Sequence, residues 1–139
     1  MRAVEIVERA LERARTRARE AGVDVRLGQG DVTDLDPAHV ESGFRLFLDT
    51  GTFHGLTDAQ RAAMARGIIR IAAPAAAILV QGWERRHRGP LPRGTDRTEL
   101  EDAFPGCETT DHGPTGFHAP PPIQLLMRPN EHWYRIRLG

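Results

Sequence analysis

Short apolar segments alternate along this chain with longer segments of helical periodicity. Residues 44–48 (FRLFL) and 76–80 (AAILV) are mostly apolar and only five residues long. Runs of this length without a polar repeat are typical of strands that are buried on both faces of a parallel sheet. The alternation gives the order β, α, β, β, α, β, α, β, β, which predicts an α/β fold with helices covering a parallel sheet.

Two helices are marked most clearly. Residues 7–21 place Leu11, Ala14 and Ala18 at helical spacing, and Gly22 follows as the expected stop. In the second helix, Thr57 and Gln60 have the spacing of a capping box, and an apolar stripe continues to residue 71. Both helices are long enough to cover neighbouring strands.

Shorter elements follow from weaker patterns. Alternating or β-rich residues predict strands at 3–6, 23–27, 107–110 and 133–138. Asp96 and Glu99 predict a capped helix that ends near Phe104. The Arg, Pro and Gly content of residues 85–94, and the Gly and Pro content of 112–122, predict irregular loops. A chain of this length is expected to form one domain over residues 1–139.

Charge and cysteine content narrow the class of partner. The 19 basic residues balance the 19 acidic ones, so no net charge favours nucleic acid or an acidic membrane surface. The longest apolar stretch, residues 71–80, is far shorter than the roughly 20 residues of a membrane helix. The single Cys107 excludes an internal disulfide and predicts a reducing compartment. The sequence therefore predicts a cytoplasmic protein with a small-molecule substrate.

Carboxylates follow three of the predicted strands. Glu5, Asp31 and Asp49 occupy these positions, and ligands of such sheets bind beyond the carboxyl ends of the strands. A carboxylate at that edge can accept hydrogen bonds from both hydroxyls of a ribose, as Glu5 would, and Asp31 could accept one from the exocyclic amine of a purine. Asp is also a common turn former, so a purely local role is an equally good interpretation of Asp31 and Asp49.

Four segments in this order, VEIVERALERAR, VRLGQGDVTDL, FRLFLDTGTFHGL and AAAILVQGW, resemble class I S-adenosylmethionine-dependent methyltransferases. The resemblance extends from about Ala3 to the closing HWYRIRL, and LDTGTFHGLTDAQRAAMARG is most similar to the thiopurine, tellurite and small-molecule methyltransferase group. It implies a three-layer αβα Rossmann-like sheet, S-adenosylmethionine as cofactor, and methyl transfer to a small-molecule acceptor.

The resemblance also implies roles for individual residues. These are Glu5 and Ile6 at the ribose, Asp31 and Val32 at the adenine, Asp49, Thr50 and Gly51 in the wall beside the transferring methyl group, and Phe53 and His54 facing the substrate. Methyl transfer from a sulfonium is an in-line displacement that depends mainly on alignment. If the substrate must lose a proton, His54 is the candidate base, since imidazole titrates near neutrality. A packing or capping role for His54 is an equally good interpretation.

Two features depart from the pattern of that family. Its first strand and glycine-rich loop, which approach the methionine end of the cofactor, have no counterpart here. The resemblance therefore implies an N-terminally truncated methyltransferase domain over residues 1–139. Pro74, Ala75 and Ala76 stand where the family usually has proline followed by glycines. Alanine disfavours a left-handed backbone, so this turn is expected to be strained or differently shaped.

A non-catalytic role is the main alternative. In a relative that keeps the fold without the first strand, the strands that would flank it lack a hydrogen-bonding partner. Such a protein could oligomerise or bind another protein through these strands. The segment DTGTFHG also imitates a glycine-rich nucleotide loop. The strand after it, however, ends in Gln81 and Gly82 rather than in a ribose-binding acid, which argues against that interpretation.

Two other groups of residues are not assigned to the site. Asp111, His112 and His118 match no common metal-ligand spacing, so no metal site is expected. Trp133 and Tyr134 stand in a closing strand and are interpreted as core residues rather than as a stacking surface for a substrate.

Overall fold

The computed structural model describes residues 1–87, 89–116 and 118–139. Its elements are β1 (Arg2–Glu5), α1 (Glu8–Glu20), β2 (Arg26–Gln29), α2 (Pro37–Val40), β3 (Phe44–Thr50), the 3-10 turn η1 (Phe53–Gly55), α3 (Asp58–Ile71), β4 (Ala72–Trp83), α4 (Arg97–Ala103), β5 (Glu108–Pro114), α5 (Pro121–Met127) and β6 (Glu131–Arg137). The predicted order of strands and longer helices is confirmed, with the short helices α2 and α5 added.

Local signals set the bounds of the two long helices. The Thr57 hydroxyl accepts the N–H of Gln60, and the Gln60 side chain accepts the N–H of Thr57, which confirms the capping box of α3. Gly22 follows α1 with a φ of 63°, and the N–H of Val23 donates to the carbonyl of Ala18 at 3.0 Å. The predicted stop at Gly22 is therefore confirmed.

The short helices lie where the sequence patterns predict none. Asp36 caps α2 by accepting the N–H of Ala38 at 2.9 Å, and Pro37 stands in its first turn. α5 begins at Pro121, inside the segment that was expected to be irregular. Both helices are too short to show a hydrophobic period. β5 likewise continues to Pro114, past the predicted end of its strand.

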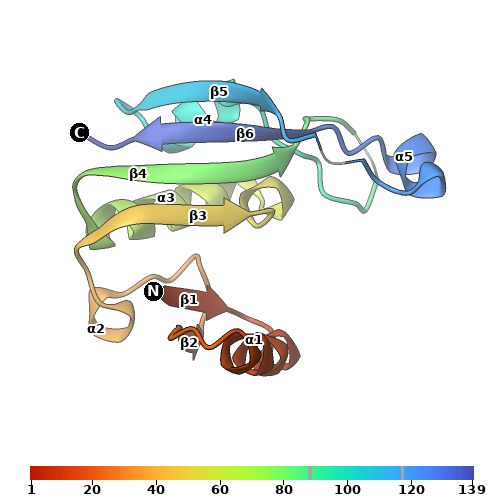
Figure 1. Cartoon of the computed structure of the whole chain (residues 1–139). Helices are drawn as coiled ribbons and strands as arrows, with labels where there is room; N and C mark the ends of the chain where they lie inside the picture. The colour runs from red at the N-terminus through yellow and green to blue at the C-terminus, as the bar shows by residue number, and fades with distance from the viewer. Residues whose placement is uncertain (88, 117) are drawn as a thin grey trace.

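The strands form two sheets (Figure 1). β3, β4, β6 and β5 lie in that order in one sheet, and β1 and β2 form a separate parallel pair. β3 and β4 are parallel, but β6 runs antiparallel to both β4 and β5. The prediction of an all-parallel sheet is wrong at β6, because the chain returns from β5 to its neighbour without crossing the sheet.

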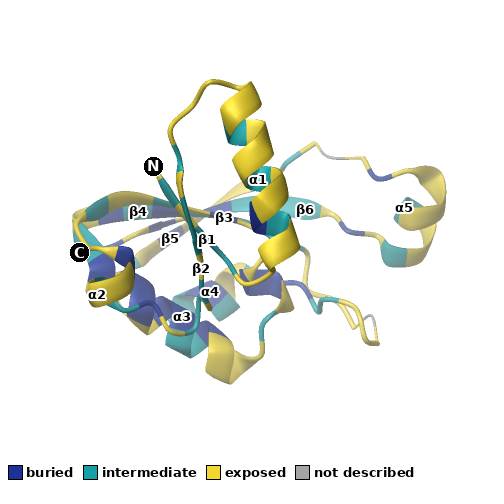
Figure 2. Ribbon diagram, turned by 90° about the horizontal axis from the view of Figure 1, so that it is seen from below, coloured by how far each residue is buried: buried dark blue, intermediate teal, exposed yellow. Residues whose placement is uncertain are grey.

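Helices lie on both sides of the strands, with α1 on one side and α3 and α4 on the other (Figure 2). Alternate residues of β4 are buried and join one apolar core with residues of α3, α4 and β6. Tyr134 belongs to this core, which confirms its interpretation as a core residue, and burial raises its pKa to about 12. Trp133 is only half-buried.

One face of β3 is left open to solvent. Leu46 and Leu48 are 60% and 64% exposed, whereas Asp49 on the alternate face is buried. In the part of the chain that the structure describes, no helix combines the length and apolar character needed to cross a membrane.

The segment after β2 links the β1–β2 pair to the larger body. Leu35 packs so closely on α3 that a methyl group at Gly67 would lie 2.9 Å from its Cβ. Arg2 donates to the carbonyl of His39 at 2.7 Å, and Arg26 pairs with Glu41 at 2.6 Å. Exposed ion pairs of this kind contribute little, so the packing of Leu35 is the stronger link.

The turn at the start of β4 carries the strain that its alanines predict. Ala75 has a φ of 58°, in the left-handed region that favours glycine. The pairing register of β3 with β4 shifts at the same place, between Phe44↔Ala72 and Leu46↔Ala77. The expected strain is therefore confirmed at Ala75.

Replacing Ala75 with glycine should stabilise the protein by about 1 kcal/mol, because glycine adopts this backbone without steric cost. Chemical denaturation measures the change. Ala77→Gly is the matched control: Ala77 lies in the regular part of β4, so glycine there should cost roughly 0.5–1 kcal/mol. Equal effects at the two positions would show that the turn stores no strain.

Candidate functional site

The carboxyl ends of β1, β3 and β4 point the same way (Figure 1). Glu5 is the last residue of β1, and its Oε1 accepts the N–H of Val7 at 3.0 Å. Gly30 donates its N–H to the Glu5 carbonyl at 3.1 Å, and the Gln29 amide donates to the carbonyl of Ile6 at 3.1 Å. These bonds fix the turn that holds the half-buried Glu5 beside the end of β2.

Asp31 forms a tight turn just beyond β2. Its Oδ1 accepts both the N–H of Thr33, at 2.8 Å, and the hydroxyl of Thr33, at 2.7 Å. The backbone N–H of Thr33, followed by its hydroxyl, holds the pKa of Asp31 below the ordinary value. The exposed carboxylate therefore stays charged to lower pH than a free Asp, while Val32 beside it packs against the core.

Asp49 ends the buried part of β3 and shapes the turn that follows it. The side chain is 6% exposed, and its two oxygens accept the N–H groups of Thr52 and Phe53, each at 2.8 Å. Gly51 has a φ of 98°, which few residues other than glycine adopt. Asp49 therefore forms a turn, as one of its two interpretations predicted. Its hydrogen bonds hold the backbone of Thr50 and Gly51 in position.

Phe53 and His54 both lie in η1, but their side chains have different neighbours. The Phe53 ring is 1% exposed and lies in the core beneath the guanidinium of Arg61, whose Cζ is 4.7 Å from the ring centroid. The expectation that Phe53 faces a substrate is therefore corrected, because its ring fills the core. His54 is 8% exposed, and its Nδ1 accepts the N–H of Trp83 at 3.0 Å.

Sequence reasoning missed the buried Arg61. It is 3% exposed and pairs with Glu99 at 2.8 Å, and it donates to the carbonyl oxygens of Phe53 and Gly94 at 3.1 and 2.7 Å. Burial lowers the pKa of Arg61, and the bond to Glu99 opposes that effect. One signal was available: Arg61 precedes Met64 by three residues and so lies on the apolar stripe of α3, where a cation needs a partner.

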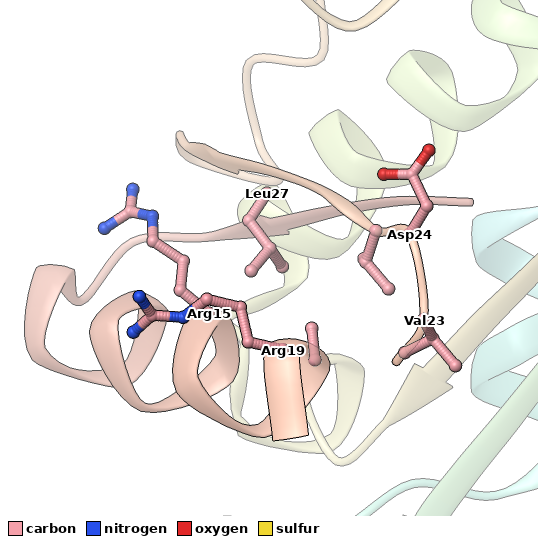
Figure 3. A pocket seen from close by; sticks show the side chains of 7 residues that line it. Arg15, Arg19, Val23, Asp24 and Leu27 are labelled. Carbon is pink, nitrogen blue, oxygen red and sulfur yellow. The ribbon is translucent and has the colours of Figure 1, made fainter. Parts of the chain in front are cut away.

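A groove lies between the C-terminal half of α1 and the segment that leads into β2 (Figure 3). Its volume is about 490 Å³, and it is lined by Arg15, Ala18, Arg19, Val23, Asp24, Val25 and Leu27. These residues lie at the amino end of β2, away from the strand ends that carry Glu5 and Asp31. The groove is open and lined by exposed charges, so the strand-end cluster is the better candidate site.

The described residues contain no group of three or more His, Cys, Asp and Glu side chains placed to hold a metal ion. Asp111 instead faces His132, with Nδ1 3.2 Å from Oδ1. The His118 Nδ1 lies 2.7 Å from the carbonyl oxygen of Gly116.

Replacing Asp49 with asparagine should destabilise the protein by about 1–3 kcal/mol, because the amide presents an NH₂ group to one of the two N–H donors. Urea unfolding measures the change. Asp24→Asn, at an exposed position, should stay within about 0.5 kcal/mol of the wild type. A loss of stability in Asp24→Asn alone, or no loss of stability in either variant, would contradict the capping role of Asp49.

No protein-family model matches the sequence, and no curated protein matches it either. Solved structures do match its fold. One comes from work on the conversion of a disulfide bond into a thioacetal group during echinomycin biosynthesis, with 19% identity and a TM-score of 0.71 over 99% of this chain and 66% of that one. Another is an S-adenosylmethionine-dependent methyltransferase from Clostridium acetobutylicum, with 10% identity and a TM-score of 0.72 over 99% and 74% of the two chains.

A third is the N-methyltransferase NodS from Bradyrhizobium japonicum, solved with S-adenosyl-L-homocysteine. It shows 13% identity and a TM-score of 0.72 over 99% of this chain and 66% of that one. This chain thus spans just under two thirds of the first and third structures, and identities this low establish the fold alone. The chain has the α/β Rossmann-like fold of S-adenosylmethionine-dependent methyltransferases.

Proposed function

We propose that this chain binds the nucleoside part of S-adenosylmethionine at Glu5 and Asp31 and takes part in methyl transfer to a small-molecule acceptor. The observation that carries the proposal is the pair of carboxylates at the ends of the adjacent parallel strands β1 and β2, in a fold shared with solved methyltransferases. Ligands of such sheets bind beyond the strand ends.

The chemistry of these carboxylates fits a nucleoside. Glu5 uses Oε1 for the N–H of Val7, and Asp31 uses Oδ1 for both bonds to Thr33. The second oxygen of each acid accepts no hydrogen bond among the described residues, so each can accept one from a ligand. In this proposal Glu5, beside the exposed Ile6, binds the ribose hydroxyls, and Asp31 with Val32 binds the adenine.

The third strand end supplies the wall for the reacting group in this proposal. S-adenosylmethionine, when bound, supplies an electrophilic methyl group on a sulfonium. Asp49 holds the backbone of Thr50 and Gly51 in place, and the absence of a side chain at Gly51 lets a ligand approach the backbone closely. Rigid positioning of this kind is the main requirement of an in-line displacement.

Calorimetric titration with S-adenosylmethionine and with S-adenosylhomocysteine tests the proposal. We expect both to bind, and we expect Asp31→Ala to weaken binding about tenfold, which corresponds to losing one charge-assisted hydrogen bond. Asp34→Ala is the matched control, because it removes an exposed carboxylate from the same turn. No heat with either ligand at millimolar concentration, or equal effects of the two variants, would overturn the assignment.

A second function, as a module that associates with another copy of itself, is favoured by one observation. Leu46 and Leu48 are exposed on one face of β3, and β3 pairs on only one side among the described strands. Open strand edges beside apolar side chains favour pairing with another chain. We propose that two copies associate through this face of β3.

Sedimentation velocity over a wide concentration range tests this association. The wild type should form dimers, and the double variant Leu46→Thr, Leu48→Thr should shift the equilibrium toward monomer because it removes apolar area but keeps β propensity. The control is Leu125→Thr, Leu126→Thr, which changes two exposed leucines of α5. A monomeric wild type, or dimers lost only in the control, would exclude association through β3.

A further inference from the structure

The antiparallel strand β6 begins at the edge of the sheet where β3 and β4 end (Figure 1). His132, the second residue of β6, pairs with Gly82 near the end of β4, and Gln81 pairs with Thr50, the last residue of β3. Since β4 lies between them, β3 and β6 are two strand spacings apart, or about 10 Å. His132 therefore lies at the same edge as the candidate site, within the reach of a small molecule from the turn after β3.

Van der Waals contacts join this position to the turn after β3. A methyl group at Gly51 would lie 3.6 Å from Cε1 of His54, and one at Gly82 would lie 3.7 Å from its Cβ. Gly82 is in turn the pairing partner of His132. The turn, η1, the end of β4 and the start of β6 thus form one continuous stretch of the sheet edge.

A bulge in the neighbouring strand accompanies a carboxylate beside His132. Asp111 pairs with Tyr134, and Pro114 pairs with His132, so β5 has one residue more than β6 between the two pairs. Gly113, inside this bulge, has a φ of 84° and donates its N–H to Asp111 Oδ1 at 2.7 Å. Bulges redirect side chains and are frequent next to active sites.

Two contacts fix the imidazole ring of His132. Its Nδ1 lies 3.2 Å from each carboxylate oxygen of Asp111, and the ring stacks on that of Tyr134 with centroids 6.0 Å apart. The side chain of His132 is still 30% exposed. Among the residues that the structure describes, none forms a hydrogen bond or an ion pair with its Nε2.

The charge of Asp111 decides which nitrogen of His132 carries the proton. Partial burial opposes ionisation of Asp111, but the N–H of Gly113 and then the ring of His132 outweigh it and hold the pKa of Asp111 below its ordinary value. Near neutral pH this carboxylate can only accept hydrogen bonds, so Nδ1 must be the donor. A neutral imidazole has a single ring proton, which leaves a lone pair on Nε2.

We infer that His132 is a proton acceptor at this edge, that Nε2 is the accepting atom, and that Asp111 is the positioning residue that fixes its tautomer. Such a pair serves methyl acceptors that arrive with a proton on oxygen, sulfur or nitrogen. The acceptor atom forms the bond to the methyl carbon, the electrons of the carbon–sulfur bond return to sulfur, and the proton passes to Nε2. The resulting imidazolium stays paired with Asp111. This use rests on the proposed function, whereas the tautomer follows from contacts within the chain.

Nitrogen-15 NMR of the labelled wild-type protein, without ligand and at a pH where imidazole is neutral, tests the tautomer. We expect the His132 proton on Nδ1, and His132→Gln assigns the signals. Asp111→Ala should mix the two tautomers in a protein that is still folded by circular dichroism. Asp102→Asn, at an exposed position of α4, should leave the His132 signals unchanged. A wild-type ring protonated on Nε2, or a tautomer that Asp111→Ala does not change, would overturn the inference.

Diethyl pyrocarbonate tests whether Nε2 is open to small molecules, because this reagent acylates an imidazole nitrogen that carries a lone pair. Mass spectrometry of peptides from the native protein measures the rate at each histidine. We expect His132 to react, and Asp111→Ala to slow it about fivefold through the loss of one partly exposed charge-assisted hydrogen bond.

His118 is the internal control for this reaction. Its Nδ1 lies 2.7 Å from the carbonyl oxygen of Gly116, so its rate should not depend on Asp111. An unreactive His132 in the folded wild type, or equal rates with and without Asp111, would overturn the inference. Neither result touches the nucleoside site, which calorimetry tests separately, and the wild-type tautomer decides the role of the pair if Asp111→Ala does not fold.

Discussion

The burial of one cation, Arg61, governs how the larger sheet and its helices fit together. A guanidinium taken from water needs nearly all of its donors satisfied, since an unpaired buried charge costs several kcal/mol. Here the partners come from two parts of the chain: the η1 carbonyls, and the segment that carries the carbonyl of Gly94 and the carboxylate of Glu99. These two parts lie about 40 residues apart along the chain, so the cation gains all of these partners only when both parts have reached their final places.

The distance along the chain between interacting residues also explains which parts of the structure could be predicted from the sequence. The capping box at Thr57 and the stop at Gly22 each depend on a few neighbouring residues, so residue type and spacing were enough. The strain at Ala75 was predicted differently, from the resemblance to a family that usually has glycines in this turn. Asp49 was correctly predicted to lie at a strand end. Whether its carboxylate binds a ligand or the backbone of the following turn, however, depends on the backbone angles of the residues in that turn. The partners of Arg61 lie up to 38 residues away along the chain, and no local pattern joins them.

The candidate site is divided between two sheets, and this division sets its rigidity. Glu5 and Asp31 belong to the β1–β2 pair, whereas the turn from Asp49 to Gly51 belongs to the larger sheet. Exposed ion pairs at Glu41 contribute about 0–1 kcal/mol each, so the contact of Leu35 with α3 at Gly67 does more to fix the two parts relative to each other. A nucleoside that touches both sheets would add to that link, because binding to the joined state stabilises it.

The turn after β3 shows how this fold can hold a stretch of backbone still at a strand end. Both oxygens of Asp49 accept backbone N–H groups, those of Thr52 and Phe53, each at 2.8 Å. A carboxylate that is engaged in this way fixes the backbone around Gly51 and is not arranged to take a proton. An in-line displacement depends mainly on the alignment of the reacting groups. In the methyl transfer proposed above, this turn would therefore contribute by holding its backbone in position rather than by acid–base chemistry.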